Sequence, residues 1–313
     1  MQGAIISQMK TILVGSLKGG VGKTTISAGL ALALSRRGFN VGAIDLDYHA
    51  PNLHILLNCN QKPTRGKGSS VIPPVANGIK VISWAMIWPP ESAVTVEDSQ
   101  VDAEDMRHVI NILRASVVSR SNGNAVLLER GLDSAVKYLN SLIDHPGGAI
   151  EHVSLLLRPG EIDWGEIDYL VVDSPPEMTG VVRVIAEHGV YGAVIVCHPS
   201  SVSLADVART IDLFRKRQVP VFGVVSNQGS VNGERRFDLE DKDVMQFSVA
   251  RGVPFILSIP HTQDLNPYFD TLVESVLTLS PVTLPKQEVD MSGVEAMLKK
   301  AKKLADILEA FKS

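Results

Sequence analysis

The residues best suited to chemistry lie in one short loop, which reads Lys18-Gly19-Gly20-Val21-Gly22-Lys23-Thr24-Thr25. An apolar run at 11–16 precedes the loop, and a helical pattern at 26–37 follows it. Glycines let backbone N–H groups converge on an anion, and the start of a helix adds its positive end. In such a loop Lys23 reaches the β- and γ-phosphates of a nucleotide, and the Thr24 hydroxyl binds Mg²⁺. The pattern therefore predicts an ATP and Mg²⁺ site, and a loop that merely links strand to helix is the plain alternative.

Carboxylates end two further apolar runs. Asp45 and Asp47 close the run at 41–45, and Asp173 closes the run at 168–173. Open α/β sheets bind ligands at the carboxyl ends of their strands. An apolar strand that ends in Asp is typical of a Mg²⁺-binding position once a phosphate loop is present, so Asp173 is predicted to hold the ion. For Asp45 and Asp47, a turn or helix cap is the simpler interpretation.

Strands and helices alternate through the second half of the chain. The predicted elements are strands at 192–197, 221–226 and 254–259 and helices at 203–217, 241–251 and 267–277. Ser203 is predicted to cap the first of these helices together with Asp206. Such alternation favours an α/β fold, with a mostly parallel central sheet covered by helices on both faces. We interpret residues 1–313 as a single domain.

Further segments are predicted to lie outside this regular pattern. Residues 60–76 read as an exposed loop, and residues 102–120 and 124–142 have helical periodicity. Added material is placed at about 89–123 and 144–162, where a partner could bind. Residues 292–313 form an amphipathic C-terminal helix that either packs on the sheet or lies on an anionic membrane.

Composition sets limits on the class of protein. The chain has 313 residues, a net charge of −4 and two cysteines, Cys59 and Cys197. A slightly negative net charge gives no overall electrostatic attraction to nucleic acid or to anionic lipid. Two cysteines far apart in the sequence suit a reducing compartment. The start of the chain lacks the features of a secretion signal, and no apolar run is long enough for a membrane span. We therefore expect a cytoplasmic protein.

The loop departs from the general phosphate-loop pattern at its first glycine, where Leu17 stands, and it carries Lys18 instead. In this form it resembles the deviant Walker A loop of the MinD/ParA/Mrp class of P-loop ATPases. The resemblance implies a homodimer in which Lys18 reaches the nucleotide of the partner. It also implies that Asp47 orients the attacking water and that Asp45 supports the Mg²⁺ shell. A solvated surface lysine is the alternative for Lys18.

A closer resemblance covers about two thirds of the chain. The segments at 163–176, 203–209, 219–227 and 252–260 are similar to the Mrp/ApbC branch of iron–sulfur carrier ATPases. The resemblance implies that Asn227 reads the adenine edge; a strand-end cap is its simpler role. Members of that branch place Cys-x-x-Cys shortly after this asparagine, whereas residues 228–238 of this chain contain no cysteine.

The absence of these cysteines argues against a cluster held in the family's usual way. Cys197 is predicted to be a small core residue, and Cys59 is left open as a lone ligand.

Together these patterns predict a slow, Mg²⁺-dependent ATPase that works as a homodimeric switch in metalloprotein assembly or maturation, with an unknown client. The alternative is a MinD/ParA-like positioning ATPase that acts on membrane or DNA. A non-catalytic nucleotide-binding adaptor is a third hypothesis.

Overall fold

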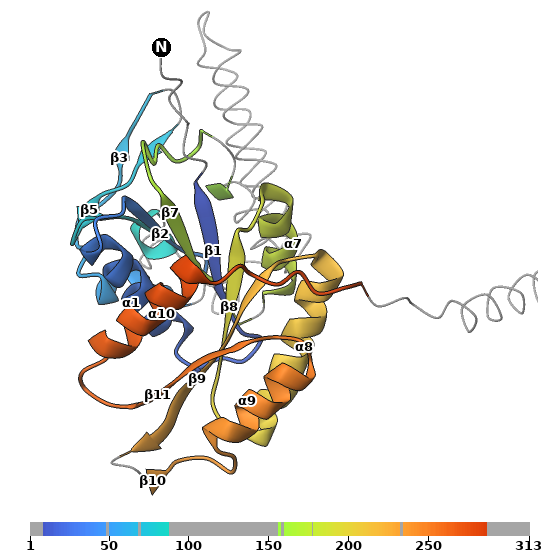
Figure 1. Ribbon diagram of the computed structural model, residues 1–313. Helices are drawn as coiled ribbons and strands as arrows, with labels where there is room; N and C mark the ends of the chain where they lie inside the picture. The colour runs from blue at the N-terminus through green and yellow to red at the C-terminus, as the bar shows by residue number, and fades with distance from the viewer. Residues whose placement is uncertain are drawn as a thin grey trace, which may run out of the picture.

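A computed structural model describes residues 9–47, 50–67, 70–87, 156–157, 160–176, 178–231 and 234–286 (Figure 1). Its strands are β1 (Lys10–Gly15), β2 (Val41–Asp45), β3 (Thr64–Arg65), β4 (Val71–Ile72), β5 (Val75–Ala76), β6 (Ile79–Ser83), β7 (Tyr169–Asp173), β8 (Gly192–Cys197), β9 (Val221–Val231), β10 (Glu234–Arg235) and β11 (Phe255–His261). Its helices are α1 (Lys23–Arg36), α2 (Leu53–Leu56), α3 (Trp84–Ile87), α7 (Thr179–His188), α8 (Ser201–Arg217), α9 (Asp241–Ala250) and α10 (Asn266–Thr278).

Apart from β3 and β4, the described strands join into one central sheet with the order β10-β9-β8-β1-β7-β2-β6-β5, and β11 pairs with β9. The pairs among β6, β2, β7, β1, β8, β9 and β11 are parallel, and the pairs β9–β10 and β5–β6 at the margins are antiparallel. The continuous apolar runs in the sequence are consistent with a parallel sheet, because a strand that is buried on both faces needs no alternation of polar and apolar residues. The predicted α/β fold is confirmed.

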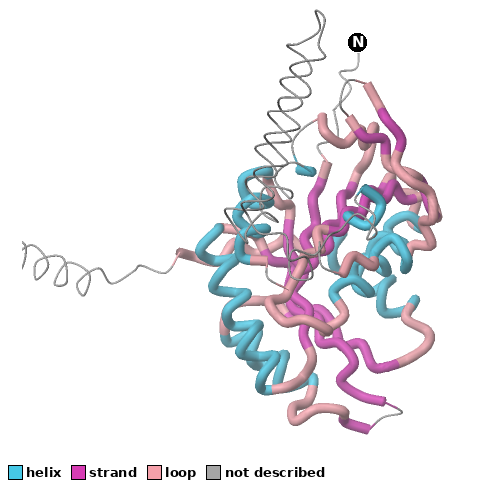
Figure 2. The backbone as a smooth tube through the Cα atoms, turned by 180° about the vertical axis from the view of Figure 1, so that it is seen from behind, coloured by secondary structure: helices cyan, strands magenta, loops and turns pink. Residues whose placement is uncertain are grey.

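Helices cover both faces of the sheet, as Figure 2 shows from behind. One face packs against α1, α2 and α10, and the other packs against α7, α8 and α9. Side chains alternate between the two layers along each strand. On β1, for example, Ile12 and Val14 belong to the α1 layer and Leu13 to the α7 layer, and all three are completely buried.

The topology brings the predicted site residues to one edge of the sheet. β1 lies between β7 and β8, and β2 lies beside β7. Asp45 of β2 stands opposite Asp173 of β7 in the register, and Asp173 stands opposite Val14 of β1. The carboxyl ends of these strands therefore meet where the loop 16–22 leads into α1.

Two local predictions are wrong. Residues 60–76 are not all loop, because β3 and β4 form a small antiparallel sheet and β5 adds to the central one. Helix α8 begins at Ser201, and its cap is Ser200, whose Oγ accepts from the Ser203 N–H at 3.2 Å. Ser203 lies inside the first turn, and its Oγ accepts from the His198 N–H, so it is part of the cap contacts without being the cap.

Two other elements differ from the prediction, one in its length and one in its presence. Strand β9 continues to Val231 where the sequence predicted an end near 226, and α7 was not predicted, although it buries Val181, Val182, Val184 and Ile185 at helical spacing. The predicted helices at 102–120, 124–142 and 292–313 lie outside the described residues. Among the helices that the structure describes, none is both long enough and apolar enough to cross a membrane.

Candidate nucleotide site

The loop between β1 and α1 has the conformation that its glycines permit. Gly20 and Gly22 have φ angles of 73° and 94°, in the left-handed region that glycine adopts readily. Gly22 is also the N-cap of α1. A Cβ atom at Gly22 would lie 2.3 Å from the Asn227 side-chain nitrogen, so space as well as conformation requires glycine there. Of the other predicted phosphate-binding residues, Val21 is buried, Thr24 and Thr25 are half-buried, and Gly19 is exposed.

The Lys23 side chain is buried against the loop. Its Nζ donates to the Lys18 carbonyl oxygen at 3.2 Å, and the residue is 7% exposed. Burial lowers the pKa of Lys23, while the charges of Asp173 and Asp47 raise it. A buried ammonium is costly unless it is paired, so a phosphate oxygen bound beside Lys23 would compensate its lost hydration.

Asp173 ends β7 beside the start of α1 and is 1% exposed. Its Oδ1 accepts from the Ser27 hydroxyl at 2.8 Å, whereas Oδ2 is buried and has no hydrogen-bond partner among the described residues. Burial raises the pKa of Asp173 to about 6, and the hydroxyls of Thr24 and Ser27 oppose that shift. An orphaned buried carboxylate oxygen near a threonine hydroxyl fits the oxygen ligands that Mg²⁺ prefers.

Asp45 is completely buried and already has protein donors on both oxygens. Oδ1 accepts from the Asp47 N–H at 3.0 Å, and Oδ2 accepts from the Leu53 N–H at 3.0 Å and the Ser83 hydroxyl at 3.3 Å. Burial, followed by the charge of Asp173, raises the pKa of Asp45 to about 7. These contacts fix the loop after β2 and the first turn of α2, so Asp45 is built to position its neighbours.

Asp47 is half-buried at the start of that loop. Its Oδ1 accepts from the Ala50 N–H at 3.2 Å. Its charge also contributes to the pKa values of Lys23, Asp45 and Asp173, which places it with the other predicted acids around the start of α1. The structure thus brings together the residues predicted to bind phosphate and metal.

Lys18 is half-buried at the beginning of the loop. Its backbone N–H donates to the Ser16 hydroxyl oxygen at 3.3 Å. The charge of Lys18 lowers the pKa of Cys197 and of His198, which places it near the end of β8. Lys18 therefore affects the pKa values of residues at the end of β8, whereas Asp47 and Asp173 affect the pKa of Lys23.

Asn227 connects the loop to a cavity of about 190 Å³. Its Nδ2 donates to the Val21 carbonyl oxygen at 2.8 Å, and the residue is 4% exposed. The cavity is lined by Thr25, Ile26, Asn227, Gln228, Pro260, His261, Thr262, Leu265 and Phe269. It therefore starts at the first turn of α1 and has its outer wall on β11 and α10.

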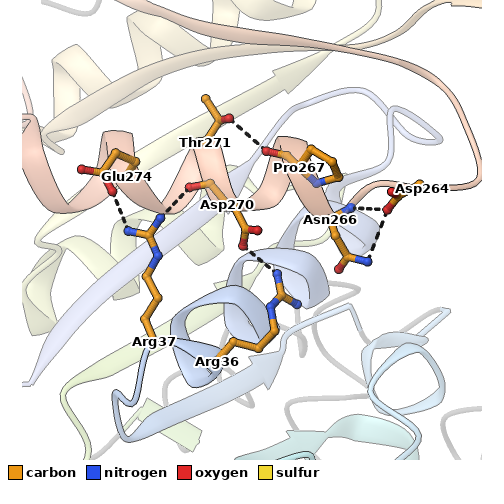
Figure 3. A network of polar contacts seen from close by, with 8 residues as sticks. All are labelled: Arg36, Arg37, Asp264, Asn266, Pro267, Asp270, Thr271 and Glu274. Carbon is orange, nitrogen blue, oxygen red and sulfur yellow. Dashed lines mark hydrogen bonds and ion pairs between the residues drawn. The ribbon is translucent and has the colours of Figure 1, made fainter.

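The outer wall is held by contacts between α1 and α10 (Figure 3). Phe269 packs so closely against α1 that a Cβ atom at Gly29 would lie 2.2 Å from its ring. At the far end of α1, Arg36 pairs with Asp270 at 2.8 Å and Arg37 with Glu274 at 2.7 Å. The sequence places the loop after Pro260 beside the adenine and leaves its contact open, and Pro260, His261 and Thr262 do line the cavity. The packing of Phe269 on Gly29 was not predicted, because nothing in local spacing links these two residues.

The remaining predicted residues concern a metal cluster. Cys197 is completely buried, which confirms the prediction of a core residue, and Cys59 is 2% exposed within the core on the α1 face. Burial raises the pKa of both thiols. Within the described ranges, no group of three or more His, Cys, Asp or Glu side chains could hold a metal ion.

Fold and loop together define a P-loop NTPase of the deviant Walker A type. Residues 7–110 and 150–290 match the family described as ParA, the NUBPL iron-transfer P-loop NTPases. The chain therefore belongs to the NUBPL/Mrp family of P-loop NTPases, and the predicted resemblance is confirmed.

Two curated relatives illustrate the family. The chain is 33% identical over 229 residues to the iron-sulfur cluster carrier protein of Deinococcus radiodurans, with 72% of this chain and 51% of that protein covered. It is 30% identical over 224 residues to the iron-sulfur cluster transfer protein NUBPL of Dictyostelium discoideum, with 71% and 54% covered. The chain thus spans about half the length of these relatives.

Solved structures share the fold. A nucleotide-binding protein of Archaeoglobus fulgidus in complex with ADP has a TM-score of 0.51 at 21% identity, covering 87% of this chain and 89% of that one. The septum site-determining protein MinD of Pyrococcus horikoshii with Mg-ADP has a TM-score of 0.54 at 17% identity, covering 87% and 97%. At these identities the likeness is one of fold.

Proposed function

We propose that this chain binds and hydrolyses ATP with Mg²⁺ and works as a homodimeric switch in the maturation of iron–sulfur proteins. The observation that carries the proposal is the arrangement on the two sides of the loop. One side has a cavity that Asn227 joins to the loop, and the other has a buried Asp173 oxygen without a partner among the described residues. In a bound nucleotide, the nucleoside would occupy the cavity at one end of the loop, and the metal-bound triphosphate would lie near Asp173 at the other end.

The phosphate groups would lie on the backbone amides of residues 19–25. Lys23 would leave the Lys18 carbonyl for the β- and γ-phosphates, which compensates the burial of its charge. Thr24 and Asp173 would hold Mg²⁺, which supplies charge neutralisation on the phosphates when bound. Asp45 belongs to the predicted metal shell, and its saturated hydrogen bonds favour a role in positioning the loop that carries Asp47.

Asp47 would orient the attacking water. It lies near Lys23 and Asp173, and its own position is set through the Asp45 carboxylate. Catalysis in this class of reaction consists mostly of positioning and charge stabilisation, so a water held in line with the γ-phosphate is the main requirement.

Lys18 would couple nucleotide binding to dimerisation. The resemblance to deviant Walker A ATPases supports this role, and Lys18 is half-buried at the beginning of the phosphate loop. Two γ-phosphates that approach each other need added positive charge, and hydrolysis removes that contact and releases the dimer. Slow turnover suits such a switch.

The client would be a metalloprotein that receives or assembles an iron–sulfur cluster. The names of the relatives support this class of client. The cysteines of this sequence are both buried in the described core, so we propose that the chain acts without a cluster held on the segment 228–238. The cytoplasmic location stays a prediction.

Calorimetric titration with Mg·ATP, followed by sedimentation velocity, tests the proposal. Wild-type protein should bind and form a dimer with ATP and not with ADP. Lys18→Ala should keep ATP binding and lose the ATP-dependent dimer, while Asp47→Asn should keep the dimer and lose hydrolysis. No heat of Mg·ATP binding to the wild-type chain would refute the proposal.

The MinD/ParA-like alternative uses the same nucleotide chemistry and a different partner. The solved-structure likenesses do not discriminate, because they show the fold alone. Co-sedimentation with anionic vesicles or DNA that requires ATP would favour this alternative. A non-catalytic adaptor would bind ATP and leave it intact in both wild-type and Asp47→Asn protein.

A further inference from the structure

Gln228 follows Asn227 on β9 and lines the same cavity. Its φ angle is 58°, in the left-handed region, which it shares with three other non-glycine residues of the described ranges. This conformation is unfavourable for a long side chain and persists where the surroundings determine it. A strained residue on the wall of a candidate binding cavity is a reason to ask what its side chain does.

Arg236 determines how the Gln228 amide is turned. Its Nη1 donates to Gln228 Oε1 at 3.0 Å. Arginine has donors and no acceptor, so the amide must present its oxygen to Arg236. The amide end left for a ligand is therefore the NH₂ group, which can only donate.

Arg236 itself is held by neighbouring groups. Its backbone N–H donates to the Gly229 carbonyl at 3.1 Å, and its guanidinium lies 5.6 Å from the centre of the Phe237 ring. Phe237 stacks on His198 with ring centres 4.6 Å apart and an interplanar angle of 19°. A row of packed side chains thus runs from the end of β8 to the Gln228 amide.

We propose that Gln228 reads the base of the bound nucleotide as a hydrogen-bond donor and that Arg236 is the positioning residue that fixes its amide. The inference rests on the proposed function, because it assigns a contact within the same nucleotide site. Adenine offers a ring-nitrogen acceptor beside its exocyclic amine. Gln228 lines the cavity, and the NH₂ group of its amide, whose oxygen accepts from Arg236, is complementary to that acceptor. The neighbouring Asn227 amide adds a second polar group to the cavity wall.

The main test compares Gln228→Glu and Gln228→Met with the wild type by titration with Mg·ATP and, separately, with inorganic tripolyphosphate. The glutamate variant keeps the contact with Arg236 and replaces the donor with an acceptor, and the methionine variant removes the donor without adding charge. We expect both variants to bind Mg·ATP about tenfold more weakly, because an acceptor on the base is left without its partner. Binding of tripolyphosphate should not change in Gln228→Met, since it has no base.

Two arginine variants test the positioning role. Arg236→Ala frees the amide to rotate, so Mg·ATP affinity should fall about threefold with kcat unchanged. Arg236→Lys keeps a donor-only side chain and should restore much of that affinity. Arg235→Ala is the matched control, because Arg235 is the neighbour in sequence, is exposed as Arg236 is, and pairs with the exposed Glu240 at 3.6 Å.

The outcomes separate this inference from the proposed function. A wild-type chain that does not bind Mg·ATP refutes the proposed function. A wild-type chain that binds, with Gln228→Glu and Gln228→Met binding equally well, overturns the role of Gln228 alone. Equal losses of ATP and tripolyphosphate in Gln228→Met would also overturn it, because they would show a change in the phosphate loop.

Discussion

The two sides of the phosphate loop are built in different ways. On the acidic side, Asp45 and Asp173 end adjacent strands, and each is almost completely buried. On the cavity side, Asn227, Pro260 and Phe269 come from three later elements, and the outermost helix is tied down by exposed ion pairs. The acidic side is preorganised by the sheet itself, whereas the cavity side depends on how α10 docks on α1.

This difference predicts unequal responses to substitution. Substitutions on the acidic side should change the rate of ATP hydrolysis, and they should change the free energy of unfolding because buried charges are removed. Changes on the cavity side should act on nucleotide affinity and on the packing of α10.

The largest effect is expected for Asp173→Asn. Loss of the carboxylate removes the predicted Mg²⁺ position, so Mg²⁺-dependent hydrolysis should fall at least about a hundredfold. Without metal, the variant should nevertheless be more stable at pH 8 than the wild type, by on the order of 1 kcal/mol, because burial raises the pKa of Asp173 to about 6 even beside Lys23, so its charged form opposes folding at pH 8. Phosphate release and chemical unfolding measure the two effects, and unchanged hydrolysis would remove Asp173 from the site.

The next effect is expected for Gly29→Ala on the cavity side. The new methyl group would overlap the Phe269 ring, so we expect a loss of about 1–3 kcal/mol in unfolding free energy and weaker ATP binding. Phe269→Leu makes room and should recover part of both losses in the double variant. A double-mutant cycle by chemical denaturation measures this coupling, and additive effects would show that the two residues act independently.

The metal-free protein should lose stability as the pH rises. The folded-state pKa values of Asp45, about 7, and Asp173, about 6, both lie above the ordinary value of 3.8. Below about pH 4 both states are protonated, and between about pH 4 and 7 the unfolded chain releases these protons first, which favours unfolding. Urea unfolding midpoints at pH 5 and pH 8 test this. Saturating Mg·ATP should reduce the difference, and a higher midpoint at pH 8 without metal would contradict the assignment.

The smallest effect is expected for Arg36→Ala. Both partners of the Arg36–Asp270 pair are exposed, at 44% and 52%, so its loss should cost less than about 0.5 kcal/mol. Thermal unfolding at low and high salt gives the measurement. A loss comparable to that of Gly29→Ala would mean that ion pairs, and not Phe269 packing, hold the cavity wall.

Much of the acidic side could be predicted from the sequence. The loop 18–25 and the apolar runs that end in Asp45 and Asp173 are local patterns, and parallel strands bring their carboxyl ends to one edge. The sequence did not predict the helix cap at Ser200, because several serines near the start of α8 could each have been the cap. It also did not predict strands β3 to β5, because a strand of two residues is too short to show a sequence pattern. Ser27 could have been found, since it lies one helical turn after Lys23.

The class of the protein follows from the order of its amino acids, because a glycine-rich loop between strand and helix needs few residues and all of them are contiguous. Three properties became visible only in the folded chain: the direction in which the Asn227 and Gln228 amides are turned, the place where Phe269 closes the cavity, and the Asp173 oxygen without a partner among the described residues. These properties depend on contacts between residues far apart in the chain, and such contacts have no fixed spacing from which a sequence pattern could predict them.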